Sequence, residues 1–163
     1  MHQPLDLPIM VLNVFIDTEF TDFVNPQLIS IGLAAASGEV FYAEVPYSAE
    51  LCSTFVRDVV LPLLGRVPHT ECATAQVGQK MIDWLEEIRR DAEVRLCFDF
   101  QTDWDLFVQA IGHVPPSWCT PRLISSRNIN ALRRYAFYKH NNFPEHHALY
   151  DAMAARHAFR ERN

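Results

Sequence analysis

The stretch VFIDTEF, residues 14–20, joins a short apolar run to two acids. Its first three residues suit a buried β-strand, and Asp17 and Glu19 follow where that strand is expected to end. Because side chains alternate between the two faces of a strand, both carboxylates point the same way. Two like charges on one face repel each other unless a positive group lies between them. The chemistry of this stretch therefore depends on what that positive group is.

Length and composition indicate one globular domain spanning residues 1–163. Hydrophobic residues make up 49% of the chain, which is typical of a folded protein. The formal net charge of −6 argues against a broad basic surface that binds long nucleic acid. It remains compatible with a site in which metal ions supply the positive charge.

The cysteines and the apolar segments bear on the compartment. The four cysteines are far apart and form no CxxC pair, which argues against a zinc ribbon and favours reduced thiols in the cytoplasm. His69 and Cys72 have the spacing of a pair of metal ligands, but the sequence contains no second such pair, so both are interpreted as ordinary residues. The first ten residues lack a positively charged region and contain Asp6, so they are not predicted to be a signal peptide. No apolar run is long enough to cross a membrane.

Hydrophobic periodicity predicts a mixed succession of strands and helices. Strands are expected at 11–17, 28–36, 40–45 and 94–100, the first three as an antiparallel meander, with a further short strand near the end of the loop 114–123. Helices are expected at 53–64 with an interruption at Pro62, and at 74–90, 103–112, 128–140 and 147–160. This order predicts an α/β fold with a mixed sheet of about five strands and helices on its faces.

Further acids follow the later core elements. Asp99, Asp103 and Asp105 come at or after the end of the fourth strand, and Asp151 lies in the last helix among several alanines. Small neighbours let that helix approach the sheet closely, so Asp151 should be buried and should need partners. If Asp17 and Glu19 were considered alone, the simpler interpretation would be that the strand ends there and that both acids are exposed to solvent.

Taken together, four acids and a histidine are what two-metal phosphodiester hydrolysis requires. Asp17, Glu19, Asp103 and Asp151 offer the oxygen ligands that two Mg²⁺ or Mn²⁺ ions prefer. Two such ions can activate a water and stabilise the leaving oxygen. His146, when neutral, could take the proton of that water.

Three motifs resemble those of the DEDDh 3′–5′ exonucleases, the superfamily of RNase T, oligoribonuclease and proofreading subunits. DTEF (17–20) is similar to the first motif, D-x-E, and HHALYDA (146–152) fits the last, H-x-A-x-x-D, as His146 and Asp151. Asp103 fits the middle motif best, because apolar residues follow it at the matching positions. The stretches around 17–45 and 60–64 are also similar to the small bacterial exoribonuclease RNase AS.

This resemblance implies an RNase H-like fold and a metal-dependent 3′–5′ exoribonuclease that releases 5′-mononucleotides from single-stranded RNA. Asp17, Glu19, Asp103 and Asp151 would bind two Mg²⁺ or Mn²⁺ ions, and His146 would be the general base. Single-stranded nucleic acid, RNA rather than DNA, would be the partner, and a homodimer is expected. Thr18, Phe20 and Trp104 are candidates for substrate contact, the aromatic rings by stacking on bases or by packing in the core.

Several alternatives stay open. Many family members carry Asn where this chain has Asp99, which is either an outer ligand or a surface residue. Asp105 is a rival of Asp103, and His147 of His146. Among Arg122, Arg127, Arg133 and Arg134, the last two are expected to form a solvated helix face, and one of the four could contact phosphate. An exodeoxyribonuclease of proofreading type and a non-catalytic nucleic-acid-binding domain are the rival functions.

Overall fold

The computed structural model describes residues 8–162. Its strands are β1 (Val11–Phe20), β2 (Leu28–Ala35), β3 (Val40–Glu44), β4 (Glu93–Phe98) and β5 (Cys119–Leu123). Its α-helices are α1 (Thr74–Arg89), α2 (Gln101–Ala110), α3 (Ala131–Asn141) and α4 (Ala148–Ala158). Short helical turns are η1 (Ala49–Leu51), η2 (Val56–Val60), η3 (Leu61–Leu63) and η4 (Ser126–Asn128). The signal-peptide prediction falls mostly on residues 1–7, which lie outside the described range.

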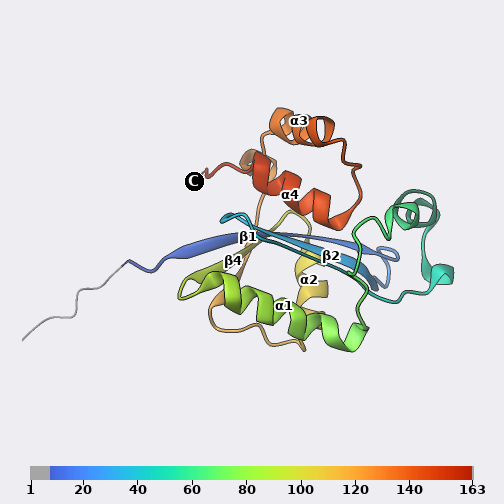
Figure 1. The fold of residues 1–163 in the computed structure, drawn as a ribbon, viewed down its shortest axis with the longest axis horizontal. Helices are drawn as coiled ribbons and strands as arrows, with labels where there is room; N and C mark the ends of the chain where they lie inside the picture. The colour runs from blue at the N-terminus through green and yellow to red at the C-terminus, as the bar shows by residue number, and fades with distance from the viewer. Residues whose placement is uncertain (1–7, 163) are drawn as a thin grey trace, which may run out of the picture.

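The five strands form one mixed sheet in the order β3-β2-β1-β4-β5. The first three strands pair antiparallel, as the predicted meander requires, whereas β1 pairs parallel with β4 and β4 pairs parallel with β5. The parallel crossover through α1 brings β4 beside the middle strand β1 (Figure 1). The predicted α/β class is confirmed, and the arrangement is consistent with an RNase H-like fold.

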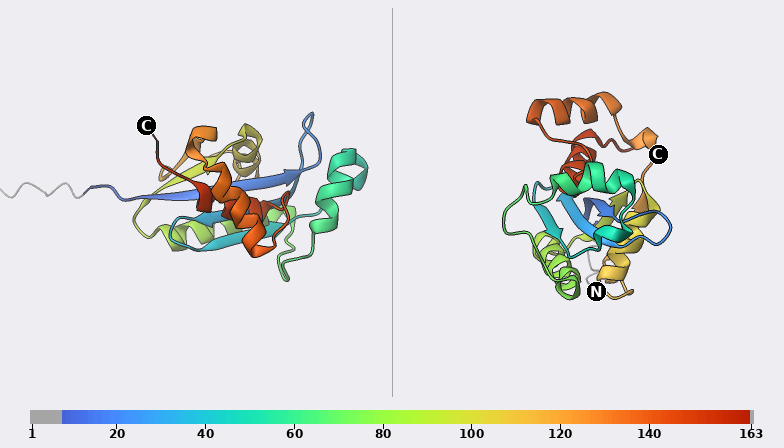
Figure 2. Two further views of the ribbon diagram at one scale, coloured as in Figure 1. Left: turned by 90° about the horizontal axis from the view of Figure 1, so that it is seen from above. Right: turned by 90° about the vertical axis from the view of Figure 1, so that its right-hand side faces the viewer.

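Helices cover both faces of the sheet. Figure 1 and the right-hand view of Figure 2 show α1 and α2 on one face, α4 on the opposite face, and α3 outside α4. The even-numbered β1 residues Val14 and Ile16 pack in the core on the α1 face, and Phe15 packs with Ile124 on the other. This alternation decides which helices each β1 side chain can meet.

Strand β1 extends to Phe20, three residues beyond its predicted end at Asp17, so Glu19 as well as Asp17 lies inside its ladder. Asp17 is opposite Gly32 of β2 and Glu19 is opposite Ser30, and the register shifts only after Glu19. The backbone of both acids is therefore held by a neighbouring strand. A fixed backbone limits how far the two carboxylates can move apart.

Helix α4 approaches the sheet as closely as its alanines suggested. Ala148, Ala152 and Ala154 are fully buried. At Gly32 of β2, an added Cβ would lie 2.4 Å from the carbonyl oxygen of Ala148, so glycine is required there. The first turn of α4 therefore rests on β2 directly opposite Asp17, and Asp151 follows in that helix.

Several predicted helices differ from the structure in their type or bounds, among them α2, which was predicted at 103–112 and spans Gln101–Ala110. The segment 53–64 contains the π turn η2 followed by the 3₁₀ turn η3 rather than an α-helix, and Pro62 has no N–H to continue a helical ladder. The helix predicted at 128–140 begins at Ala131, since the Asn130 side chain accepts from the Arg133 amide and caps it.

The last helix also ends earlier than predicted, at Ala158 rather than at residue 160. Phe159 pairs with Ile129 in an isolated β-bridge, and the Arg160 amide donates to the Asn128 carbonyl. These contacts take the chain out of the helix. Among residues 8–162, no helix has the length and apolarity needed to cross a membrane. All four cysteines are buried as free thiols, and the compartment stays a prediction.

Candidate metal centre

Two groups of carboxylates converge where β1 meets α2 and α4, and they share one member. Asp17 lies with Asp99 and Asp103 in the first group, and with Glu19 and Asp151 in the second. In each group, one oxygen from each of the three carboxylates lies within 4.8 Å of the others. Asp17 lies between the two groups, so the five acids could hold metal between them. The donors are all carboxylate oxygens, which suit hard cations such as Mg²⁺, Mn²⁺ or Ca²⁺.

The carboxylate of Asp103 is oriented by hydrogen bonds from Thr18 of strand β1. Asp103 is 2% exposed in the first turn of α2, and its Oδ1 accepts hydrogen bonds from the Thr18 amide (3.0 Å) and the Thr18 hydroxyl (2.6 Å). Thr18 lies between the two β1 acids and therefore points to the α2 face. Its hydrogen bonds orient the Asp103 carboxylate. Thr18 also lines the pocket of the acids, so its predicted contact with substrate stays a prediction.

The carboxylate of Asp151 is oriented by hydrogen bonds from helix α3 and from the segment before α4. Its Oδ1 accepts a hydrogen bond from the Tyr138 hydroxyl of α3 at 2.6 Å. Its Oδ2 accepts one from the backbone amide of His146 at 3.1 Å. Both oxygens of this buried carboxylate are therefore oriented by the protein itself.

Burial and mutual repulsion raise the pKa values of the clustered acids. Loss of water raises the pKa of Glu19 to about 8, with a further contribution from Asp151. Burial also raises the pKa of Asp103 to about 7, although the hydrogen bonds from Thr18 oppose the rise. The pKa of Asp17 lies well above its usual range because of burial first and then the charge of Asp151. A divalent cation would relieve this repulsion and favour the ionised carboxylates.

The two adjacent histidines have different surroundings. His146 is exposed and lines the same pocket as the acids, with its ring edge-on to Phe55 at 5.0 Å between centroids. Its φ of +64° lies in the left-handed region that favours glycine or asparagine. Four other non-glycine residues in the described part of the chain share a positive φ, so the position of His146 in the acid pocket, rather than its backbone, links it to the site.

His147 is instead 2% exposed and stacked between two tyrosine rings. Its ring centroid lies 4.7 Å from that of Tyr42 and 4.1 Å from that of Tyr150. Neither ring nitrogen has a hydrogen-bond partner in the described part of the chain. Burial lowers the pKa of His147 to about 4. His147 does not line the acid pocket, so the structure brings His146 and not its rival to the acids.

The acids line one side of a cavity of about 370 Å³ whose other walls are aromatic. Phe20, which was a candidate from the sequence, lines this cavity together with Phe23, Phe55 and Phe100. The Phe20 and Phe23 rings lie 5.3 Å apart, and the Phe23 and Phe100 rings 5.6 Å apart. Phe23, Phe55 and Phe100 are 76%, 51% and 47% exposed, so the cavity opens onto a phenyl-lined rim.

Trp104 does not reach this cavity, which corrects its place among the substrate-contact candidates. Its ring stacks on Phe98 at 6.0 Å and lies 5.6 Å from Phe107, packed against the main core. Helical geometry explains the difference, because Trp104 is next to Asp103 and neighbouring helix residues face different directions. Trp104 is therefore a packing residue of α2.

Asp99 and Arg134 enter the site as a pair. The Arg134 Nη1 lies 3.8 Å from Asp99 Oδ2, and the Arg134 side chain is 35% exposed. Arg134 therefore does not belong to a solvated helix face as predicted, because α3 turns it toward the acids. Arg133 is exposed. Arg122 forms an ion pair with Glu161, with 2.6 Å between Nη2 and Oε1, and this pair does not belong to the acid cluster. Asp105 is exposed and accepts from Gln101, as expected for the rival that points elsewhere.

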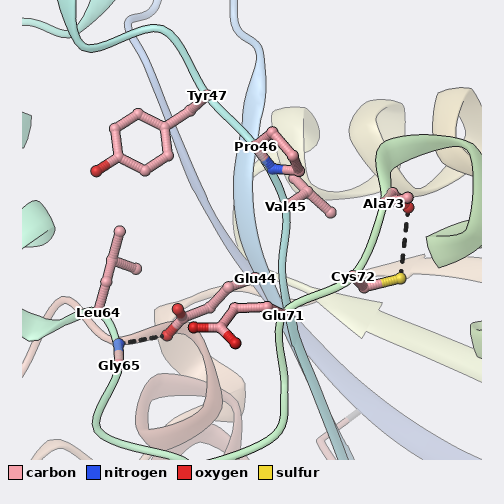
Figure 3. A pocket seen from close by; sticks show the side chains of 9 residues that line it. All are labelled: Glu44, Val45, Pro46, Tyr47, Leu64, Gly65, Glu71, Cys72 and Ala73. Atoms are coloured by element: carbon pink, nitrogen blue, oxygen red, sulfur yellow. Dashed lines mark hydrogen bonds between the residues drawn. The ribbon is translucent and has the colours of Figure 1, made fainter.

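A larger hollow, of about 620 Å³, lies beside β3 and also contains two acids (Figure 3). There, Glu44 accepts hydrogen bonds from the Tyr42 hydroxyl (2.8 Å) and the Gly65 amide (2.9 Å), which compensate its burial. The Glu71 carboxylate lies beside it. Among the described residues, neither Glu44 nor Glu71 belongs to a group of three metal-type ligands. The chemistry of the donors, rather than the size of the hollow, identifies the β1 acids as the candidate centre.

Some residues of the centre were not predicted from the sequence. Phe23 and Phe100 each follow an acid directly, which is a weak local signal, whereas Phe55 comes from the irregular segment 53–64. Tyr138 had no signal at all, because its hydroxyl meets Asp151 only when α3 lies over α4. No protein-family model matches the chain, and a search of curated proteins finds no match either. The geometry of the acids and the three motifs are thus the basis for a functional conclusion.

Proposed function

We propose that this protein is a metal-dependent 3′–5′ exonuclease of the DEDDh type that shortens single-stranded RNA and releases 5′-mononucleotides. The proposal rests on one observation: two sets of three carboxylates lie close together and have Asp17 in common. Two oxygen-ligand sets that share one carboxylate could hold two cations close together, as two-metal hydrolysis requires. Asp17, Glu19, Asp103 and Asp151 would hold two Mg²⁺ or Mn²⁺ ions, and Asp99 would join Asp17 and Asp103 at the outer edge.

The protein's own residues divide the remaining work. Bound cations would supply an activated water and stabilise the leaving 3′ oxygen of the phosphodiester. His146 would accept the proton of the water as general base, since its ring faces the acid pocket and is accessible to solvent. The hydrogen bond that the His146 backbone amide donates to Asp151 links the proposed base to a proposed ligand, so both would keep their relative positions.

The phenyl rim supports a single-stranded substrate. Phe20, Phe23 and Phe100 form a chain of ring contacts next to the acids, and Phe55 stands beside the His146 ring. Aromatic faces stack on any unpaired base, at about 1–3 kcal/mol for each base. A base-paired end would have to be opened before its bases could use such a rim. The preference for RNA and the expected homodimer rest on the resemblance to RNase AS.

A single assay tests the proposal. Oligomers of RNA and DNA of one sequence, labelled at the 5′ end, would be incubated with the protein and Mg²⁺, Mn²⁺ or EDTA. We expect stepwise shortening of the RNA from its 3′ end with either metal and no shortening in EDTA. A 3′-phosphorylated RNA of the same sequence serves as control, because its blocked end should slow the first step.

The outcomes of this assay separate the alternatives. Preferential shortening of the DNA would assign the exodeoxyribonuclease activity instead, since the choice of sugar depends on contacts to the 2′-OH. Binding of both oligomers without cleavage in any metal would assign the non-catalytic nucleic-acid-binding domain. Cleavage that continues unchanged in EDTA would contradict the role proposed for the acids.

A further inference from the structure

Helix α3 reaches the candidate centre through two side chains, Tyr138 and Arg134. Tyr138 is 5% exposed and is the one buried residue among the eleven of α3. Its hydroxyl donates to Oδ1 of Asp151 at 2.6 Å. One turn earlier on the same helix, Arg134 lies near Asp99. Two side chains of α3 therefore reach the acids, while Phe137 of the same helix packs against Phe143 and His157.

The hydroxyl of Tyr138 completes the orientation of the Asp151 carboxylate. Oδ2 is already held by the His146 amide, so the second bond to Oδ1 stops rotation of the carboxylate about its own axis. Each carboxylate oxygen can accept two hydrogen bonds or ligands. Each oxygen of Asp151 therefore keeps capacity for a further ligand, and one of the two lies within 4.8 Å of carboxylate oxygens of Asp17 and Glu19.

We propose that Tyr138 is a positioning residue that holds Asp151 in the orientation required to bind a divalent cation. The inference rests on the proposed metal centre and extends it to a residue of a helix that carries none of the five acids. Without the hydroxyl, Asp151 would sample other rotamers, and part of the free energy of metal binding would be spent in ordering it. Partners that orient a metal ligand typically change metal affinity by about 10–100-fold.

Tyr138→Phe tests the proposal, because it removes the hydroxyl and keeps the ring that packs between α3 and α4. Tyr150→Phe is the matched control: it removes a hydroxyl from α4 next to Asp151, and among the described residues that hydroxyl makes no hydrogen bond to the acids. The affinity for Mn²⁺ would be measured by titration calorimetry without nucleic acid, with the signal of free Mn²⁺ in electron paramagnetic resonance as a second readout.

We expect Tyr138→Phe to weaken Mn²⁺ binding by about 10–100-fold, and Tyr150→Phe to change it by less than about twofold. At saturating Mn²⁺ the two variants should turn over RNA at similar rates, because the affected property is the holding of a ligand. Thermal unfolding in EDTA and in Mn²⁺ provides a further measurement. The difference between the two Tm values can be compared between variants even if a substitution changes the Tm in EDTA. The Mn²⁺-induced rise in Tm should be smaller for Tyr138→Phe than for the parent.

The results distinguish this inference from the proposed function. If the parent cleaves RNA and Tyr138→Phe binds Mn²⁺ as tightly as the parent, the positioning role is wrong and the exonuclease proposal stands. If Tyr138→Phe loses Mn²⁺ affinity but the parent never cleaves nucleic acid, the positioning role stands without the exonuclease. Failure of the parent itself to bind Mn²⁺ would overturn both.

Discussion

The backbone amide of His146 donates a hydrogen bond to the Asp151 side chain, five residues along the chain, at 3.1 Å. This contact requires the left-handed backbone of His146 and the start of α4 at Ala148. It places an accessible imidazole beside a buried carboxylate in one short segment. The proposed base and a proposed metal ligand therefore form one local unit, and the predictions below separate their roles.

Replacement of His146 by Asn should remove the base without straining the chain, because Asn tolerates the left-handed region. The amide that donates to Asp151 remains, so Mn²⁺ should bind as in the parent. Turnover of RNA should fall by about 10²–10⁴, the usual range for loss of a general acid–base group. Single-turnover rates with saturating RNA and metal measure this. Parent-like rates for His146→Asn would remove histidine from the mechanism.

Asp103 and Asp105 provide a matched pair two residues apart in α2. Asp103→Asn keeps the Oδ1 acceptor for Thr18 but removes the charge, so metal-dependent cleavage should fall more than about 10²-fold, beyond the effect of an outer partner. Asp105→Asn, in an exposed position, should leave the rate within about twofold. Rates at several Mg²⁺ concentrations provide the comparison. The opposite ranking would show that the middle motif had been assigned to the wrong acid.

The clustered acids predict a specific dependence of stability on pH in the absence of metal. Burial raises the folded-state pKa of Glu19 to about 8 and that of Asp103 to about 7, above the usual values of about 4 expected in the unfolded chain. The folded state therefore binds more protons between these limits. The free energy of unfolding should decrease as the pH rises from about 4 to about 8.

Divalent metal should oppose that loss of stability. Urea unfolding in EDTA and in Mn²⁺ at pH 5 and at pH 8 tests this, with the larger stabilisation by Mn²⁺ expected at pH 8, where cation binding displaces fewer protons. In Asp17→Asn, which removes the shared acid, the decrease with pH should be shallower. A metal-free parent whose stability increases steadily from pH 5 to pH 8 would contradict the repulsion described here.

Gly32→Ala should disturb the centre through the backbone of α4. The added Cβ would lie 2.4 Å from the Ala148 carbonyl oxygen, so the first turn of α4 must move away from β2. We expect a loss of about 1–3 kcal/mol in the free energy of unfolding, together with weaker Mn²⁺ binding. Gly38→Ala is the control, since Gly38 lies in the β2–β3 turn with a φ of +118° that disfavours alanine, and its added Cβ would meet no atom within 4 Å. It should lower stability while leaving the Mn²⁺ affinity of the folded protein unchanged.

His147 should behave as a packing residue despite its position beside the proposed base. His147→Phe keeps a ring between Tyr42 and Tyr150 and removes two buried nitrogens without partners, which should raise stability by about 1 kcal/mol. His147→Ala should instead lose about 2–4 kcal/mol by opening a cavity. Denaturant unfolding and RNA turnover are measured together. A large loss of turnover in a stable His147→Phe would give that imidazole a chemical role.

Much of the fold was predictable from local patterns. The β-meander, the long helix α1 and the α/β class all follow from periodicity that each segment carries in its own sequence. Apart from the segment 53–64, where π and 3₁₀ turns replace the predicted helix, the errors occurred at the ends of elements. Strand β1 continues through Asp17 and Glu19 because β2 pairs with both, and the last helix stops at Ala158 because Phe159 pairs with Ile129. Element ends depend on partners elsewhere in the chain, which local periodicity does not contain.

That Asp17 and Glu19 share a face follows from their spacing, because side chains alternate along any strand. The close approach of α4 to the sheet likewise follows from its alanines, which leave the space for it. The hydrogen bonds from Thr18 to Asp103, 85 residues away, and from Tyr138 to Asp151 form only in the folded chain. Folding also brings the phenyl rings of the rim together and buries the His147 ring between Tyr42 and Tyr150. Local geometry is fixed by the covalent chain, whereas these contacts exist only after distant segments pack together.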